Sequence, residues 1–563
     1  MKHFKLFLMV LAIAAGTVDV QAQGSKKQWI KSSIKSMTIR EQIAQLFVIV
    51  CHPRQGEAHI SKVLETIQAE QVGGLIWGEC KPTDYIHLLN QFQAQVRIPM
   101  MVTMDAEWGI SMRIDSVVRF PQQLTLGAIE DNSLIYDFGV EVARQCTEIG
   151  VHFNFAPVVD INSNPKNPVI GMRSFGENKY KVTEKAYVYM KGMHDMGILT
   201  CIKHFPGHGD TDRDSHQELP VISHNKERLN DVELYPFREL IKRGAKGVMT
   251  AHLLVPALSS DNNPTSQSKD ICTDLLQKKL KFKGLVVTDG LEMRGAVHGR
   301  DTSKVALYAL MAGNDILEIP VDVKKSIDEI EKAVKNKTIS KKYVQKKCKK
   351  ILAAKYDLGL HKGFTPIDPA GIADRLNTKH TQSLRMKLSQ ASITLLSNNN
   401  VLPVRSPKVA YVEIGQGDAF KAQMEEFGVT EWLSIPPNQS RETLDSLSTK
   451  LTGAEVVVVG CHNVPRGRLA ASYGVDSPVI DFVDQIGRDH KVVLVFFGNP
   501  YSLSNFTDLE RFSSVVVAYD NSTEAQIASA KALFGKQGFY GKLPVTINEK
   551  YTEDFGLIVL DPQ

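Results

Sequence analysis

Residues 199–216 read LTCIKHFPGHGDTDRDSH, and this stretch decides the fold prediction. Its first seven residues form a short, mostly apolar run, which is typical of a strand buried on both faces of a sheet. Lys203 and His204 lie near the end of that run. The following residues contain two glycines and a proline, which favour a loop, and they carry several titratable side chains. The stretch therefore predicts a buried strand that leads into a highly charged loop.

Seven further apolar runs of similar length occur in the first 320 residues. Helical patterns such as 133–150 and 181–197 separate them, and an alternation of strands and helices predicts a parallel sheet. Eight such units over roughly 300 residues predict an N-terminal (β/α)8 TIM barrel, which we place at residues 30–360. The other predicted strands are 45–51, 73–79, 99–105, 153–160, 247–253, 284–290 and 315–320.

A second region of α/β pattern follows the barrel. Residues 361–384 begin with two prolines and two glycines and are predicted to form a linker. Residues 385–563 alternate strands with helices such as 524–535, which predicts a C-terminal α/β sandwich domain. No GxGxxG motif follows its first strand, so nucleotide binding is not indicated. Its predicted strands are 391–397, 408–414, 454–460, 491–498 and 514–520.

The N-terminus has the pattern of a secretory signal peptide, predicted at residues 1–22. Lys2 and Lys5 precede an apolar run of about ten residues, which is too short for a stable membrane anchor, and Val20-Gln21-Ala22 resembles a cleavage site. We therefore expect a periplasmic or secreted protein that has no membrane contact after cleavage. An uncleaved anchor is the alternative.

Charge and cysteine content narrow the class of protein. The net charge of +5 is small for 563 residues, so a nucleic-acid partner is not expected, and the lysine-rich stretch 340–359 is predicted to form a cationic helix. Seven cysteines are scattered without a CxxC pair, and several lie in apolar runs, where free cysteine behaves as a small core residue.

Polar side chains end several of the predicted barrel strands. They are Asp105, Lys203, His204, His252 and Asp289. Active sites of TIM barrels lie at the carboxyl ends of the strands, so these side chains are expected to converge on one rim together with the loop after strand five. The alternative is that each residue only caps or solvates a loop.

A metal site is one interpretation of the charged loop. The alternating aspartates of 210–214 resemble the start of a calcium loop, but Ser215 and Val221 occupy the positions that require glycine and glutamate. A zinc site made of His204, His208 and His216 matches no established ligand spacing and is the weaker alternative. We therefore expect no metal and no cofactor.

Proton transfer suits the loop better. Asp214 lies two residues before His216, so its carboxylate can orient the imidazole, and the other ring nitrogen can deliver a proton to a leaving group. Asp289, at the tip of a rigid strand, is a candidate nucleophile that can attack a sugar's anomeric carbon.

Three segments together resemble glycoside hydrolase family 3, in particular its bacterial β-N-acetylglucosaminidase branch: KHFPGHGDTDRDSH (203–216), NPVIGMRSFGE (167–177) and FKGLVVTDGLEM (282–293). The resemblance covers about residues 38–355. It implies a retaining mechanism with Asp289 as nucleophile and His216, paired with Asp214, as acid/base. It also implies that five further residues bind the substrate: Asp105, Arg173, Lys203, His204 and His208.

The sequence departs from the family pattern beside the predicted pocket. Ala106-Glu107-Trp108-Gly109-Ile110 replaces the usual residues after strand three, Met172 precedes Arg173, and Gly290 follows Asp289. These departures affect the expected choice of substrate more than the type of reaction.

Together with the signal-like N-terminus, the resemblance implies an exported, exo-acting enzyme that removes terminal GlcNAc from peptidoglycan fragments or related oligosaccharides. A β-glucosidase or xylosidase of the same family, a phosphorolytic variant, and a non-catalytic protein that binds muropeptides or sugars remain alternatives.

Overall fold

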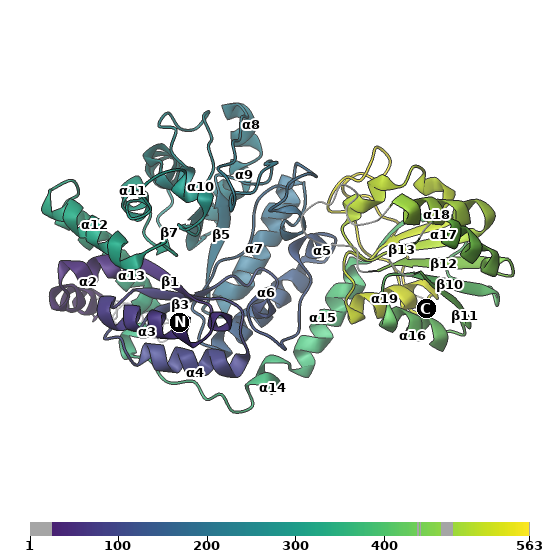
Figure 1. The fold of residues 1–563 in the computed structure, drawn as a ribbon, viewed down its shortest axis with the longest axis horizontal. Coiled ribbons are helices and arrows are strands. Elements are labelled where there is room, and N and C mark those ends of the chain that lie inside the picture. The colour runs from purple at the N-terminus through teal and green to yellow at the C-terminus, as the bar shows by residue number, and fades with distance from the viewer. Residues whose placement is uncertain (1–24, 436–438, 440, 463–476, 562–563) are drawn as a thin grey trace, which may run out of the picture.

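The computed structural model describes residues 25–435, 439, 441–462 and 477–561. The predicted signal peptide at 1–22 lies outside these residues. The described chain forms a barrel followed by a smaller α/β unit, and Figure 1 shows them side by side, with α14 (Ile372–Leu376) and α15 (Lys379–Ser392) between them.

The barrel contains eight strands in the order β7-β6-β5-β4-β3-β2-β1-β8, and each hydrogen-bonded pair along this order is parallel. The sheet closes through a parallel bridge between Val287 and Ile316, supported by a hydrogen bond from Thr288 N to Ile316 O (3.1 Å). The predicted TIM barrel is thus confirmed. Its strands are β1 (Phe47–Cys51), β2 (Gly74–Trp77), β3 (Met101–Met104), β4 (Phe153–Asn154), β5 (Leu199–Phe205), β6 (Gly247–Thr250), β7 (Leu285–Thr288) and β8 (Leu317–Glu318).

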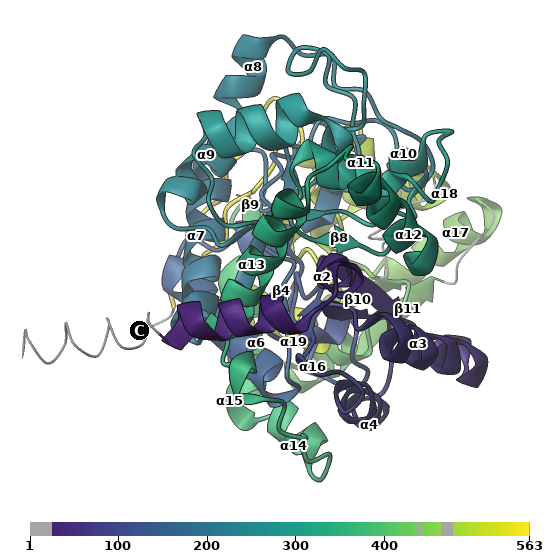
Figure 2. The ribbon, with the colours of Figure 1, turned by 90° about the vertical axis from the view of Figure 1, so that its left-hand side faces the viewer.

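Helices surround these strands (Figure 2). Several begin at side chains that cap them: Asn178 accepts hydrogen bonds from the backbone N–H groups of Tyr180 and Lys181, and Ser340 accepts one from Tyr343. The helices are α2 (Ile39–Ala44), α3 (Glu57–Glu70), α4 (Pro82–Gln93), α5 (Gln123–Gly127), α6 (Asn132–Glu148), α7 (Lys179–Asp195), α8 (Lys226–Asp231), α9 (Leu234–Lys242), a π-helix (Asp270–Lys279), α10 (Arg294–Val297), α11 (Val305–Ala312), α12 (Val323–Lys335) and α13 (Lys341–Asp357).

The second unit has a six-stranded sheet in the order β11-β10-β12-β13-β14-β9, in which only β9 is antiparallel to its neighbour. Apolar clusters cover both faces, which confirms the predicted sandwich. The strands are β9 (Thr394–Asn398), β10 (Val409–Ile414), β11 (Glu431–Ile435), β12 (Val456–Cys461), β13 (Lys491–Phe496) and β14 (Ser514–Val517); the helices are α16 (Asp418–Glu426), α17 (Arg441–Ser448), α18 (Ser477–Asp489) and α19 (Thr523–Leu533).

The segment predicted as a linker contains regular structure. Residues 361–384 include α14 (Ile372–Leu376) and the start of α15 (Lys379–Ser392), so the expected boundary at residue 385 falls inside a helix. α15 contacts both α6 of the barrel and α19 of the sandwich, and therefore packs against both units.

The cores match the apolar pattern of the sequence. All seven cysteines are buried and unpaired, which agrees with their interpretation as core residues. Among the described residues, no helix has the length and apolar character needed to cross a bilayer.

Candidate active site

The carboxyl ends of the barrel strands carry the predicted residues. Asp105 directly follows β3, Lys203 and His204 lie near the end of β5, and Asp289 directly follows β7. Because all eight strands are parallel and form a closed barrel, these side chains lie at the same end of it. Arg173 comes from the long loop between β4 and α7, and the Asp214–His216 pair comes from the loop after β5.

Lys203 is the centre of a buried ion-pair cluster. Its Nζ lies 2.8 Å from Asp105 Oδ1 and 2.8 Å from Glu107 Oε1. Arg173 donates two hydrogen bonds to Glu107, at 2.7 and 3.0 Å, and Arg113 donates one to Asp105 at 2.9 Å. Such bidentate pairs fix geometry as well as charge. The structure therefore brings together three of the predicted sugar-binding residues.

Electrostatics keep this cluster ionised. Burial alone would raise the pKa of Glu107, but the neighbouring Arg173 and Lys203 lower it to about 2. Burial likewise opposes ionisation of Asp105, yet Lys203 and Arg113 hold the pKa of Asp105 well below its ordinary value. Both carboxylates are therefore charged at neutral pH. Asp105, whose side chain is 20% exposed, can accept hydrogen bonds from sugar hydroxyls. Glu107, by contrast, is fully buried and bonds Arg173 and Lys203.

His204 is oriented by Asp160, a residue that the sequence does not mark as part of the site. His204 Nδ1 lies 2.7 Å from Asp160 Oδ2, and His204 Nε2 lies 3.3 Å from Arg173 Nη2. Asp160 is buried and also accepts a hydrogen bond from the backbone N–H of His208 at 2.7 Å. Only the position of Asp160 at the end of predicted strand 153–160 could have indicated that it belongs to the site.

His208 lies inside the loop after β5. It is 1% exposed, and its ring nitrogens lie 2.9 Å from Thr211 Oγ1 and 3.1 Å from Ser215 Oγ. Burial lowers the pKa of His208 to about 4, so the ring is neutral at pH 7. These contacts favour support of the loop over direct sugar binding.

Asp214 and His216 form the predicted pair. His216 Nδ1 lies 2.7 Å from Asp214 Oδ1, which also accepts a hydrogen bond from the His216 backbone N–H at 2.9 Å. The Asp214 side chain is 8% exposed, whereas that of His216 is 60% exposed. A fixed carboxylate thus orients an imidazole that is open to solvent and substrate, as proton transfer requires.

Asp289 is half-buried at the tip of β7. Its backbone N–H donates to Thr250 O at 3.0 Å, and its Oδ1 accepts from the Gly290 N–H at 2.9 Å. Burial raises the pKa of Asp289, but His204, His252, the Gly290 N–H and Lys203 together lower it below its ordinary value. The carboxylate is therefore ionised at neutral pH, which is the form that acts as a nucleophile.

The His216 loop lies beside the turn that follows Asp289. Ser215 O accepts a hydrogen bond from Gly295 N at 3.1 Å, and a Cβ on Gly295 would lie only 2.9 Å from that oxygen. His252, at the end of β6, bonds Gly290 O through Nε2 (2.9 Å) and lies within electrostatic range of both Asp289 and His216. The structure thus places the segments after β5 and β7 side by side.

Two further carboxyl groups flank Asp289. Glu318, at the end of β8, is 4% exposed, and its Oε2 has no hydrogen-bond partner among the described residues. Burial, together with Asp105, Asp289 and Glu292, raises the pKa of Glu318 well above its ordinary value and so favours the protonated carboxyl group. Burial and the nearby Asp289 also raise the pKa of Glu292, to about 7. The run 315–320 has the pattern of an ordinary apolar strand, so the sequence does not indicate that Glu318 belongs to the site.

The geometry does not favour the zinc alternative. His204 bonds Asp160, His208 bonds Thr211 and Ser215, and His216 bonds Asp214. Within the described part of the chain, no group of three or more His, Cys, Asp or Glu side chains is arranged to hold a metal ion.

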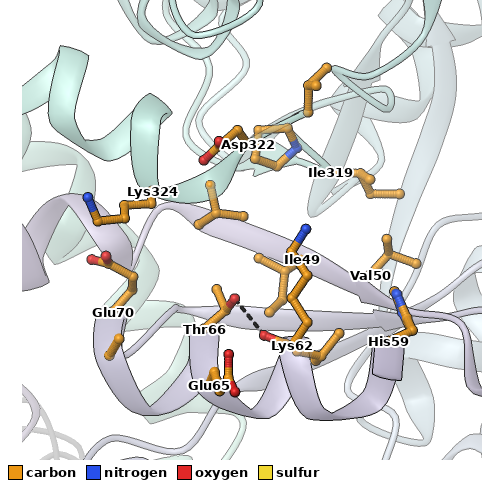
Figure 3. Close-up of a pocket in the computed structure, with 15 residues that line it drawn as sticks. Ile49, Val50, His59, Lys62, Glu65, Thr66, Glu70, Ile319, Asp322 and Lys324 are labelled. Carbon is orange, nitrogen blue, oxygen red and sulfur yellow. Dashed lines mark hydrogen bonds between the residues drawn. The ribbon is translucent and has the colours of Figure 1, made fainter. Parts of the chain in front are cut away.

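A separate groove of about 490 Å³ lies on the outside of the barrel (Figure 3). It is bounded by α3 and by the segment from β8 into α12, with Lys62, Thr66, Asp322 and Lys324 among its lining residues. None of the eight predicted site residues lines it. The groove is therefore distinct from the cluster at the barrel mouth.

An ionised carboxylate, an Asp–His pair and a cluster of charged hydrogen-bonding groups at one end of a TIM barrel are the groups that a TIM-barrel glycosidase would use. The chain belongs to glycosyl hydrolase family 3: the N-terminal domain of that family matches residues 38–354.

Sequence similarity to the following relatives extends over most of the chain. It is 27% identical over 515 residues to Beta-hexosaminidase A of Pseudoalteromonas piscicida, covering 81% of this chain and 84% of that protein. It is 24% identical over 551 residues to a Beta-N-acetylglucosaminidase/beta-glucosidase of Cellulomonas fimi, covering 92% and 95%. A solved family 3 beta-N-acetylglucosaminidase from Paenibacillus sp. str. FPU-7 superposes with a TM-score of 0.78 at 27% identity, covering 91% of this chain and 99% of that one.

Proposed function

We propose that this protein is an exo-acting, retaining β-N-acetylhexosaminidase that releases terminal β-linked GlcNAc from peptidoglycan fragments. The observation that carries the proposal is the ionised Asp289 at the tip of β7, beside the loop that presents the Asp214–His216 pair. The names of two relatives and of the Paenibacillus structure support the choice of sugar.

The proposed reaction is a double displacement. Asp289 attacks the anomeric carbon and forms a glycosyl ester, while His216 donates its proton to the leaving oxygen. Neutral His216 then accepts a proton from water, which attacks the same carbon, releases the sugar with net retention and restores the Asp289 carboxylate. The buried cluster around Lys203 binds and orients the sugar hydroxyls.

The proposal also includes where in or outside the cell the enzyme acts. The signal-like sequence at 1–22 supports export to the periplasm or the medium, where cell-wall fragments are available. A β-glucosidase is the second candidate, because the Cellulomonas fimi relative carries both activities in its name.

Initial rates on 4-nitrophenyl N-acetyl-β-glucosaminide and on the matching β-glucoside test the proposal. We expect higher kcat/KM on the first substrate, and no rate above background for Asp289→Ala. Proton NMR of the first-formed sugar should show the β-anomer. A preference for the glucoside would support the second candidate, and an unchanged rate in Asp289→Ala would overturn the mechanism.

A further inference from the structure

The loop between β4 and α7, residues 155–178, determines the position of two groups in the site. Asp160 orients His204 through a hydrogen bond, and Arg173 donates two hydrogen bonds to Glu107. Any contact that fixes this loop therefore also fixes part of the sugar-binding cluster.

The sandwich domain contacts this loop first through Tyr501, which follows β13. Asn162 Nδ2 donates a hydrogen bond to Tyr501 Oη at 3.2 Å. The Tyr501 ring belongs to a small buried cluster with Met172, the residue directly before Arg173. Leu124 and Val545 complete that cluster.

The second contact is made by residues 544–546 of the sandwich. Pro544 O accepts a hydrogen bond from Glu177 N at 3.1 Å. Thr546 donates two hydrogen bonds to the Glu177 carboxylate, from its backbone N–H at 3.0 Å and from its hydroxyl at 2.5 Å. The two segments approach closely because residue 176 is glycine: its φ is +146°, and a Cβ there would lie 2.3 Å from Pro544 O.

The β4–α7 loop also contacts the base of the His216 loop. Asn167 Nδ2 donates hydrogen bonds to His208 O and Gly209 O, at 2.8 and 3.0 Å. A Cβ on Gly209 would lie 1.7 Å from Ile161 O, so the two backbones are in direct contact. A continuous series of contacts thus runs from the sandwich domain to both sides of the candidate site.

We propose that the C-terminal sandwich domain holds the β4–α7 loop in the position that the sugar site requires, and that Tyr501 and Thr546 are positioning residues for Arg173 and Asp160. The inference rests on the proposed sugar site. It gives the second domain a role in substrate binding through the position of the β4–α7 loop.

The variants Tyr501→Phe and Thr546→Val, alone and combined, remove the two hydroxyl groups with little change in side-chain volume, and Thr546→Val also removes the acceptor of a hydrogen bond from Glu553 N within the sandwich. Lys181→Met is the matched control, because it breaks the ion pairs of α7 with Glu553 and Asp554 of the sandwich and leaves the hydroxyl groups of Tyr501 and Thr546 in place. We expect the double variant to lose about tenfold in kcat/KM, mainly through a higher KM, because small displacements of binding groups are costly. Thr546→Ser keeps the hydroxyl group that Thr546→Val lacks and should therefore have the wild-type kcat/KM, as should Lys181→Met.

Hydrogen–deuterium exchange tests the same inference without any substrate. Peptides within 160–177 should exchange faster in the double variant and at the wild-type rate in Lys181→Met. Wild-type exchange and wild-type KM in the double variant would overturn the inference, as would equal changes in the control. Failure of the wild type to hydrolyse any N-acetyl-β-glucosaminide would refute the proposed function instead, and the exchange data would still decide the role of the domain.

Discussion

The Asp214–His216 pair gives the sharpest test of the proposed proton transfer. A hydrogen bond to a charged group contributes about 1.5–3 kcal/mol. The 2.7 Å distance is short, but His216 is 60% exposed, which places the contribution at the lower end of that range. Because each factor of ten in rate corresponds to about 1.4 kcal/mol, Asp214→Ala should lower kcat/KM about tenfold. His216→Ala removes the acid itself and should cost about 10²–10⁴.

The assay compares leaving groups. A dinitrophenyl N-acetyl-β-glucosaminide needs little protonation of its departing oxygen, whereas a phenyl glycoside needs it strongly. We therefore expect the loss in His216→Ala to be largest for the phenyl substrate and small for the dinitrophenyl substrate.

Asp210→Ala is the matched control, since Asp210 lies on the same loop and also pairs with a histidine, His224. It should leave all rates near the wild-type values. Equal losses on both substrates in His216→Ala, or equal losses in Asp210→Ala, would refute the assignment of His216 as the acid.

Three further predictions concern the surroundings of Asp289. Glu318→Gln should raise the melting temperature at pH 8 but not at pH 4. Burial raises the pKa of Glu318, so the wild type loses stability as pH rises above the ordinary glutamate pKa of 4.5. The glutamine amide does not ionise, so the variant does not lose this stability. Lys203→Met leaves two carboxylates without their shared buried cation and should cost about 3–5 kcal/mol of unfolding free energy in urea denaturation. Gly295→Ala places a Cβ 2.9 Å from Ser215 O and should lower kcat/KM at least about tenfold. Gly453→Ala, which meets open space, should not.

The barrel was predictable because its strands are buried on both faces and therefore read as continuous apolar runs. The edge strand β11 (Glu431–Ile435) was missed for the converse reason, since Glu431, Trp432 and Ser434 are exposed and only two of its residues are buried. The prolines and glycines of 361–371 predicted a linker, yet the residues after them form α14 and begin α15. Local breaker residues mark where a helix cannot continue, and they do not determine the structure of the residues after them.

The site was predictable where one motif holds both partners. Asp214 and His216 lie two residues apart, so their contact follows from local spacing. Asp160 and His204 are 44 residues apart, and the pairing of β4 with β5 in the fold brings them together. Glu318 shows the same limit, because its carboxyl group becomes notable only when Asp105 and Asp289 surround it in the fold.

The central claim is that Asp289 forms a covalent bond to the sugar. Incubation with a 5-fluoro-N-acetylglucosaminyl fluoride, followed by peptide mass spectrometry, tests this claim most directly. We predict one added sugar per chain, located on Asp289 within residues 284–293 and absent from Asp289→Ala. A sugar attached to another residue, or turnover of the fluoride with no adduct at any time, would contradict it.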